Sequence, residues 1–219
     1  MTLHAQTDGV TPRTLVIDTA TQACSVALLE GAAVVAARHE VVGRGHAEQL
    51  VPMIAGLPGE GRATRILVDC GPGSFTGIRV GLAAAIGLGI GWGVPVHGYS
   101  STALVAAAGL ATRIGAGEGA GELAVVLEGG HGEVFMQLFA HPLRALGPLA
   151  SLRPEAALAL LGGRAAIGNG VRHLAALDPA LDLSEALPVA ADALLLPPGS
   201  AGLPPRPIYG RAPDAVPKA

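Results

Sequence analysis

The heptapeptide GPGSFTG at residues 71–77 decides how this sequence is interpreted. The apolar run at 65–70 predicts a buried strand, and the nearly uncharged run at 75–90 predicts a long helix. Ser74 is the expected N-cap of this helix, because its hydroxyl can accept a hydrogen bond from a free amide of the first turn. The heptapeptide is therefore expected to form a tight turn from a strand into a helix.

The glycines of this turn have two interpretations. A glycine-rich turn before a helix can leave amide groups free to cradle an anion such as a phosphate. The same glycines can instead let the helix lie close to its sheet, because a residue without a Cβ permits another backbone to approach. For a turn of this composition alone, close packing is the favoured interpretation.

Strands and helices are expected on both sides of the heptapeptide. Three apolar runs upstream predict an antiparallel meander, and a second group of elements follows a glycine-rich loop at 115–121. The expected strands are 14–18, 23–30, 33–41, 65–70, 94–98, 122–128, 133–140 and 164–168. The expected helices are 45–57, 75–90, one capped by Ser100 or Ser101 that runs to 109, and 154–161.

A faint internal repeat points to two lobes. Residues 16–18 form an apolar strand that ends in an acid, and the chain turns through small residues and returns at 26–28. The same pattern recurs at 126–128 and 136–138. A duplicated architecture would produce this repeat.

The composition is that of an aliphatic protein with little charge. Half of the 219 residues are apolar, aromatic residues make up 3%, and the formal net charge is −3. Lys218 is the single lysine and no basic run occurs, so we expect any contact with RNA to be shared with another protein. Cys24 and Cys70 occupy apolar, strand-like positions and are expected to be reduced thiols, which suits the cytoplasm.

Residues 80–96 carry no charge and could be mistaken for a membrane span. The stretch contains five glycines and Pro95, and it is shorter than the about 20 residues that a spanning helix needs. Residues 1–13 lack the apolar core of a secretory signal. We therefore expect a cytoplasmic protein without membrane contact.

The heptapeptide and its surroundings resemble the bacterial TsaB (YeaZ) family. The resemblance is strongest over 14–105 and covers nearly the whole chain. It rests on IDTATQACSVALLEG at 17–31, GHAEQLVPMI at 45–54, GPGSFTGIRVGLAAAIGLG at 71–89, and weaker matches at 132–139, 168–170 and 207–215.

This resemblance implies the two-lobed α/β fold of the actin-like ATPase (ASKHA) superfamily, with a ribonuclease-H-like core in each lobe. It implies a non-catalytic scaffold and dimerization subunit that binds and activates TsaD and, with it, recruits TsaE. Their product is N6-threonylcarbamoyladenosine at adenosine 37 of tRNA, which this subunit is expected to contact only indirectly. A homodimer is implied when TsaD is absent.

The expected domains follow from the resemblance and the glycine-rich loop. They are a flexible N-terminus at 1–12, a first lobe at 13–112, a second, degenerate lobe at 113–205, and a tail at 206–219 that can return to the first lobe.

Departures from catalytic relatives indicate that this chain is not itself an enzyme. Those relatives bind a metal through a helical His-x-x-x-His pair, which residues 98–104 lack, so no metal site of that type is expected. Active members of the superfamily carry an aspartate followed by glycine in each lobe. Here Ala20 stands where that glycine is usual in the first lobe, and Glu128 stands where relatives have aspartate in the second.

The nucleotide site is therefore expected to be vestigial. No residue is expected to be catalytic, no cofactor is required, and ATP or ADP is expected to bind at most weakly or at a subunit boundary. Asp18 either holds the metal of a nucleotide through water or, as we favour, caps the end of its strand. The remaining candidate contacts are Thr19, Gly71, Gly73 and Ser74.

Two helices carry the expected partner surface. In the helix at 45–57, the stripe of Ala47, Leu50, Val51 and Ile54 is expected to face the sheet, which leaves a neighbouring face for a partner. The helix at 75–90 is apolar all round, so the sheet can cover only part of it. The expected partner contacts are His46, Gln49, Met53, Leu57, Arg79, Leu82, Ala83, Ile86 and Ile90. The alternative that Met53 and Leu57 belong to the core stays open.

Two other functions remain as alternatives. A stand-alone ATP-dependent phosphotransferase would need intact phosphate turns, against which Ala20 argues. A glycoprotease would need a metal pair, or a base beside Ser74, and the sequence shows neither.

Overall fold

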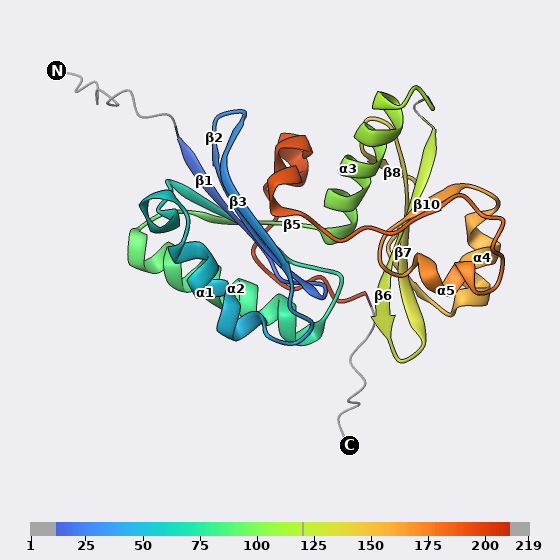
Figure 1. The fold of residues 1–219 in the computed structure, drawn as a ribbon, viewed down its shortest axis with the longest axis horizontal. Coiled ribbons are helices and arrows are strands. Elements are labelled where there is room, and N and C mark those ends of the chain that lie inside the picture. The colour runs from blue at the N-terminus through green and yellow to red at the C-terminus, as the bar shows by residue number, and fades with distance from the viewer. Residues whose placement is uncertain (1–11, 120, 211–219) are drawn as a thin grey trace.

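The computed structural model of this chain describes residues 12–119 and 121–210. The expected flexible segment at 1–12 therefore lies, except for Pro12, outside the described residues, as does the tail after residue 210. Figure 1 shows two lobes side by side, each built around one sheet.

The first sheet has the strand order β3-β2-β1-β4-β5. Its first three strands form the expected antiparallel meander, and β4 and β5 then pair in parallel beside β1. The strands are β1 (Arg13–Asp18), β2 (Ala23–Glu30), β3 (Ala33–Val41), β4 (Arg65–Asp69) and β5 (Val96–Tyr99).

Both faces of this sheet are covered, because successive side chains of a strand point to opposite faces. Leu15 and Ile17 of β1 pack against the helices α1 (His46–Ala55) and α2 (Phe75–Trp92) on one face. Val16 points to the other face, toward α3 (Ser101–Gly115) and the 3-10 helix η2 (Ala190–Leu195). A short 3-10 turn, η1 (Pro58–Gly61), links α1 to β4.

The second sheet repeats the connectivity of the first. Its hairpin of β6 (Glu122–Gly130) and β7 (Glu133–Ala140) is antiparallel, as that of β1 and β2 is. β10 (Ala165–Ile167) then pairs in parallel with β6, and β11 (Leu183–Ser184) pairs in parallel with β10. β8 (Arg144–Ala145) and β9 (Ala150–Leu152) both lie antiparallel to β7, where β3 lies beside β2 in the first sheet. The faint repeat in the sequence thus reflects a duplicated topology.

The helices of the second lobe are shorter. α4 (Pro154–Leu161) and α5 (Val171–Ala175) pack on one face of its sheet, through a core that includes Ala157, Leu161 and Leu174. α3 covers the other face and therefore lies between the lobes.

The helix α3 is longer than expected, because Gly109 does not end it. A Cβ on Gly109 would lie 2.7 Å from Leu123 Cδ2 and 3.1 Å from Ile167 Cδ1. This glycine therefore allows the helix to sit closely on the second sheet, and the helix continues to Gly115.

The chain leaves the second sheet after β11 and returns to the first lobe. η2 packs on β1, β2, β3 and α3, and the amide of Ala190 donates to Ser25 Oγ at 2.9 Å. After a last 3-10 turn, η3 (Pro198–Ser200), Leu203 forms a β-bridge with Gly98, and the amide of Ile208 donates to the carbonyl of Cys70 at 2.7 Å.

The helix α2 begins and ends at clear signals. Ser74 caps it by accepting a hydrogen bond from the amide of Gly77 at 3.2 Å, and Gly93 ends it in the left-handed conformation, with a φ of 68°. Within the described residues it is the one helix long and apolar enough to cross a membrane, by length and composition alone. One of its sides packs on β1, β4 and α1 of the first lobe.

Candidate functional site

Two buried acids meet at the carboxyl ends of neighbouring parallel strands. Asp18 ends β1, Asp69 ends β4, and their carboxyl groups share a hydrogen bond. The hydroxyl of Tyr99 donates to Asp18 Oδ2 at 3.0 Å. Ser101 Oγ lies 2.8 and 2.7 Å from the two oxygens of Asp69, and the amide of Gly71 donates to Asp69 Oδ1 at 2.7 Å. These contacts give each acid several partners within the protein.

The burial of this pair sets its charge. Burial raises the pKa of Asp69 well above its usual range, and the neighbouring negative charge of Asp18 raises it further. Burial also raises the pKa of Asp18, although the hydrogen bonds from Asp69 and Tyr99 oppose this rise. The two carboxyl groups are therefore expected to hold one proton between them, because two adjacent buried carboxylates repel each other.

The GPGSFTG turn packs directly on the turn that follows β1. The amide of Ser74 donates to the carbonyl of Ala20 at 2.6 Å, and Thr19 Oγ1 donates to the carbonyl of Gly77 at 2.7 Å. A Cβ on Gly73 would lie 2.0 Å from the oxygen of Ala20. The glycines thus allow two backbones to touch, which is the close-packing interpretation.

This packing engages the groups that were expected as vestigial nucleotide contacts. Asp18 bonds to Tyr99, the hydroxyl of Thr19 holds the start of α2, and the amides of Gly71 and Ser74 donate to protein oxygens. The carboxylate of Asp18 is thus held within the core at the end of its strand. Asp69, Tyr99 and Ser101 complete this cluster. One local signal in the sequence points to this cluster: the predicted strand at 65–70 contains an acid near its end, as the predicted strand at 14–18 does.

The second lobe carries a more open counterpart at Glu128, near the end of β6. One oxygen of its carboxylate pairs with Arg172 of α5 and lies 3.6 Å from His173 Nε2. Its amide donates to Asn169 Oδ1 at 3.1 Å, in the GNG turn at 168–170. Within the described ranges, no three His, Cys, Asp or Glu side chains lie close enough together to hold a metal ion.

The outer face of α2 is open. Ile90 is 78% exposed, Phe75 56% and Ile86 41%, and Arg79 and Ala83 are exposed beside them. We call the face formed by Arg79, Ala83, Ile86, Gly87, Ile90 and Gly91 the outer α2 face. Gly87 and Gly91 have nothing within 4 Å of the position of a Cβ. Leu82, expected in this surface, is 6% exposed and packs in the core on the inner side, so that expectation is wrong for Leu82.

The orientation of α1 corrects a second part of the expected partner surface. Met53 and Leu57 are buried in the core of the first lobe with Leu50 and Ile54, whereas Val51 is 62% exposed. The buried stripe is thus turned by about one residue from the expected one, and the alternative that Met53 and Leu57 widen the core is correct.

His46 belongs to the same buried side of α1. Its Nε2 lies 3.1 Å from the carbonyl oxygen of Ala23 on β2, a bond that compensates for the burial of a polar ring. Gln49 and Ala47 stay exposed. Of the four residues expected at a partner on the predicted helix at 45–57, only Gln49 is accessible.

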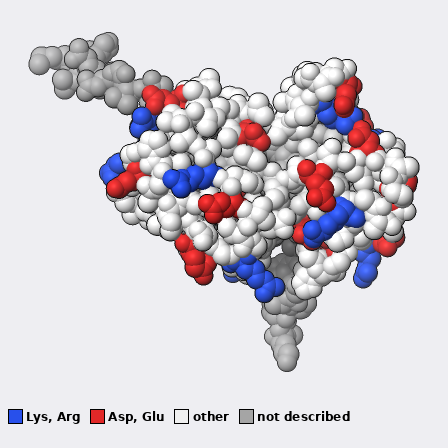
Figure 2. Space-filling model, in the orientation of Figure 1, with Lys and Arg blue, Asp and Glu red and all other residues white. Residues whose placement is uncertain are grey.

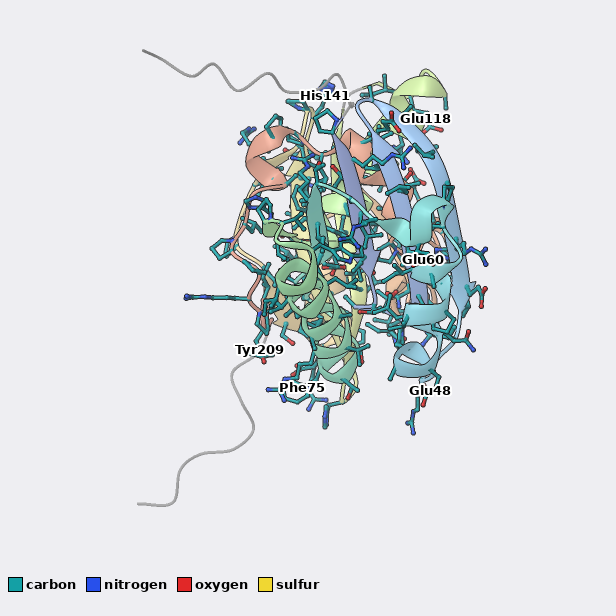
Figure 3. All side chains as sticks on the ribbon, turned by 90° about the vertical axis from the view of Figure 1, so that its left-hand side faces the viewer. Glu48, Glu60, Phe75, Glu118, His141 and Tyr209 are labelled. Atoms are coloured by element: carbon teal, nitrogen blue, oxygen red, sulfur yellow. The ribbon has the colours of Figure 1, made fainter. Side chains whose placement is uncertain are left out.

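An aromatic cluster stands at the N-terminal end of α2. The rings of Phe75 and Tyr209 are stacked, with their centroids 5.8 Å apart, and both lie at the same end of the helix in Figure 3. The guanidinium of Arg79 lies 3.6 Å over the Phe75 ring and donates to the hydroxyl of Tyr209 at 3.2 Å. The sequence did not indicate this cluster, because Tyr209 is far from α2 along the chain.

Comparison with known proteins places this geometry in context. Residues 34–148, just over half of the chain, match the family described as TsaD, tRNA N6-adenosine threonylcarbamoyltransferase. An uncharacterized protein of Mycobacterium tuberculosis is 31% identical over 159 residues, which cover 68% of this chain and 71% of that protein. The Escherichia coli tRNA threonylcarbamoyladenosine biosynthesis protein TsaB is 38% identical over 94 residues, 41% of this chain and 40% of its own length.

A solved structure agrees over nearly the whole length. YeaZ from Pseudomonas aeruginosa superposes with a TM-score of 0.71 at 28% sequence identity, and the match covers 90% of this chain and 99% of that one. Together with the duplicated strand order, this likeness confirms the two-lobed, actin-like α/β fold with a ribonuclease-H-like core in each lobe.

Proposed function

The chain belongs to the TsaB (YeaZ) family, and we propose that it acts in forming N6-threonylcarbamoyladenosine in tRNA as the non-catalytic subunit that binds and activates TsaD. Relatives named TsaB are described as biosynthesis proteins of this same modification. Adenosine 37 is the proposed target, and the TsaD-bound pair recruits TsaE.

The observation that carries this proposal is the outer α2 face. Ile90 is the most exposed large apolar side chain in the described part of the protein, and Ile86 lies one turn before it on the same face. Exposed apolar patches of this kind mark interaction sites, because the removal of apolar surface from water lowers the free energy. Gly87 and Gly91 leave open space beside the two isoleucines, so the backbone of a partner helix can approach closely. We propose that a helix of TsaD packs here.

The same face is proposed to form a homodimer when TsaD is absent. An isologous dimer uses one patch on both copies, and a helix with small residues on its surface can cross a copy of itself. TsaD then competes with the second copy for the same residues. The exposed Gln49 of α1 and Arg79 of α2 are the proposed polar contacts at the rim of this interface.

The buried acid pair supports a role without catalysis. Asp18 is fully buried and bonded to Tyr99, so no substrate can reach its carboxylate in this conformation. The Ser74 and Gly71 amides donate to protein oxygens, which removes donors that a phosphate would need. We propose that the chain requires no cofactor, and that ATP or ADP binds, if at all, weakly or at the boundary with TsaD.

The charge distribution supports indirect contact with tRNA. In Figure 2, acidic and basic side chains are interspersed over the visible face, and no continuous basic surface covers it. A protein that binds RNA by itself usually presents such a surface to the phosphates. TsaD is therefore proposed to contribute the main tRNA contacts, in the cytoplasm where the modification takes place.

Reconstitution of the modification tests this function. TsaD, TsaE, tRNA and a threonylcarbamoyl donor are combined with and without this chain, and the modified nucleoside is quantified by mass spectrometry. We expect product only when the chain is present, and no ATP hydrolysis by the chain alone. Equal modification without the chain would refute the proposed role. Metal-dependent ATP hydrolysis that Asp18→Asn abolishes would instead favour the phosphotransferase alternative.

A further inference from the structure

A cavity of about 530 Å³ lies between the two lobes, away from the outer α2 face. One wall is α3 and the adjoining strands β6 and β10 of the second sheet. The opposite wall is the segment 184–189, which crosses from β11 to η2, together with His39 of β3 and Asp192 of η2 (Figure 1). Its volume is within the range of sites for small organic molecules.

The floor of this cavity is lined by apolar and small residues. Gly109 holds α3 close to Leu123 and Ile167, as described above. Leu104 and Ala108, which lie one helical turn apart on α3, also line the cavity, and the small side chain of Ala108 leaves it open. Pro188 and Val189 close the floor from the crossing segment.

The charged side chains at the rim of the cavity give it a net negative charge. Arg113 also lines the cavity, but its guanidinium is already paired with Glu118 at 3.0 Å and Asp182 at 2.9 Å. The carboxylates of Asp192 and Glu185 form no hydrogen bond or ion pair with any described residue.

Asp192 is the more buried of these two acids, since Glu185 is exposed. Burial raises the pKa of Asp192, and the nearby His39 only partly offsets this effect. Partial burial of an unpaired carboxylate costs free energy, because the group loses part of its hydration. A cation beside it would compensate for this loss.

We propose that this cavity binds a small organic cation, with an ammonium group at Asp192 and an apolar body against α3 and β10. The apolar floor accommodates the body, and the unpaired carboxylates select a positive head group over a neutral or negative one. Because the walls come from both lobes, the bound molecule holds η2 and the crossing segment to the second sheet.

Isothermal titration of the purified chain with three matched probes tests this proposal. 4-Phenylbutylamine, 4-phenylbutanol and 5-phenylvalerate share the same phenylbutyl body and differ in charge. We expect the amine to bind with a Kd in the about millimolar range, the alcohol about tenfold more weakly, and the carboxylate not measurably. Equal binding of all three probes, or no binding of the amine up to about 10 mM, overturns the proposal.

Two variants locate the binding. Asp192→Asn is expected to remove the preference for the amine over the alcohol, and Ala108→Phe is expected to abolish binding of both by filling the cavity. The matched controls are Glu48→Gln, an exposed acid on α1, and Ala111→Phe, an exposed position on α3 outside the cavity. Amine binding that survives Asp192→Asn and Ala108→Phe unchanged places the ligand elsewhere and contradicts the proposal.

Discussion

At the scale of single residues, Asp18 and Asp69 show how a position associated with catalysis can become part of a core. Both stand at the carboxyl ends of parallel strands, which is where ligands bind in open α/β sheets. In this chain Tyr99 and Ser101 occupy the space around them and satisfy their oxygens. In this conformation both acids are therefore part of the core of the first lobe.

The acid pair makes the stability of the protein depend on pH. In the unfolded chain an aspartate loses its proton near pH 4, whereas burial raises the pKa of Asp69 well above that in the folded state. The folded protein thus holds one more proton between these two values. The stabilisation that this proton provides is complete below the unfolded pKa and is lost as the pH rises through the folded pKa. The free energy of unfolding then falls by at most about 1.4 kcal/mol per pH unit.

Asp69→Asn is expected to remove this pH dependence. The amide oxygen can still accept from Gly71 and Ser101, and the amide nitrogen can donate to Asp18 without titrating. Urea unfolding between pH 5 and 9 should show a flatter profile for the variant than for the wild type. Glu48→Gln, at an exposed carboxylate, is the control and should leave the profile as it is. A slope unchanged in Asp69→Asn would show that the pair does not titrate as described.

At the scale of elements, α2 uses its glycines in two different ways. Gly77 lies against the turn after β1, where a Cβ would come within 2.0 Å of the carbonyl oxygen of Thr19. Gly87 lies on the outer face, with open space around it. One glycine therefore serves packing within the chain, and the other serves access from outside.

Alanine at these two positions should have opposite effects on stability. Gly77→Ala is expected to destabilise the fold by at least about 2 kcal/mol, because a backbone carbonyl cannot move aside as a side chain can. Gly87→Ala is expected to stabilise it by up to about 1 kcal/mol, the difference in helix propensity between the two residues. Urea denaturation measures both. A shift of the same sign in the two variants would contradict the assigned environments.

The helix α1 shows that helical periodicity alone does not determine which face of a helix is buried. The expected stripe of Ala47, Leu50, Val51 and Ile54 fits a helical period as well as the buried one does. The structure selects the stripe that includes His46 and Met53, since the imidazole finds the carbonyl of Ala23. The expected stripe left His46 and Met53 on a face for a partner, and only the position of the neighbouring strand β2 shows that this face is buried.

At the scale of the whole molecule, most of the fold could be predicted and most of the contacts between distant segments could not. The bounds of β2, β3, β7 and α4 agree with those expected, because alternating or helical patterns and their turn residues are local signals. β8, β9, β11 and α5 were not predicted, because elements of two to five residues carry only a weak periodic signal. Tyr209 beside Phe75 and Asp192 beside His39 arise from the return of the chain end to the first lobe, which no local pattern encodes.

The central claim is that the outer α2 face binds TsaD, and light scattering of size-exclusion fractions from the mixed proteins tests it most directly. Ile86→Glu and Ile90→Glu alter exposed side chains, so both variants should stay folded, as circular dichroism can verify. Leu160→Glu, on the exposed side of α4, is the matched control. We predict that the control forms the heterodimer with TsaD and that both isoleucine variants remain monomeric beside it. A full yield of heterodimer from both folded isoleucine variants would contradict the account.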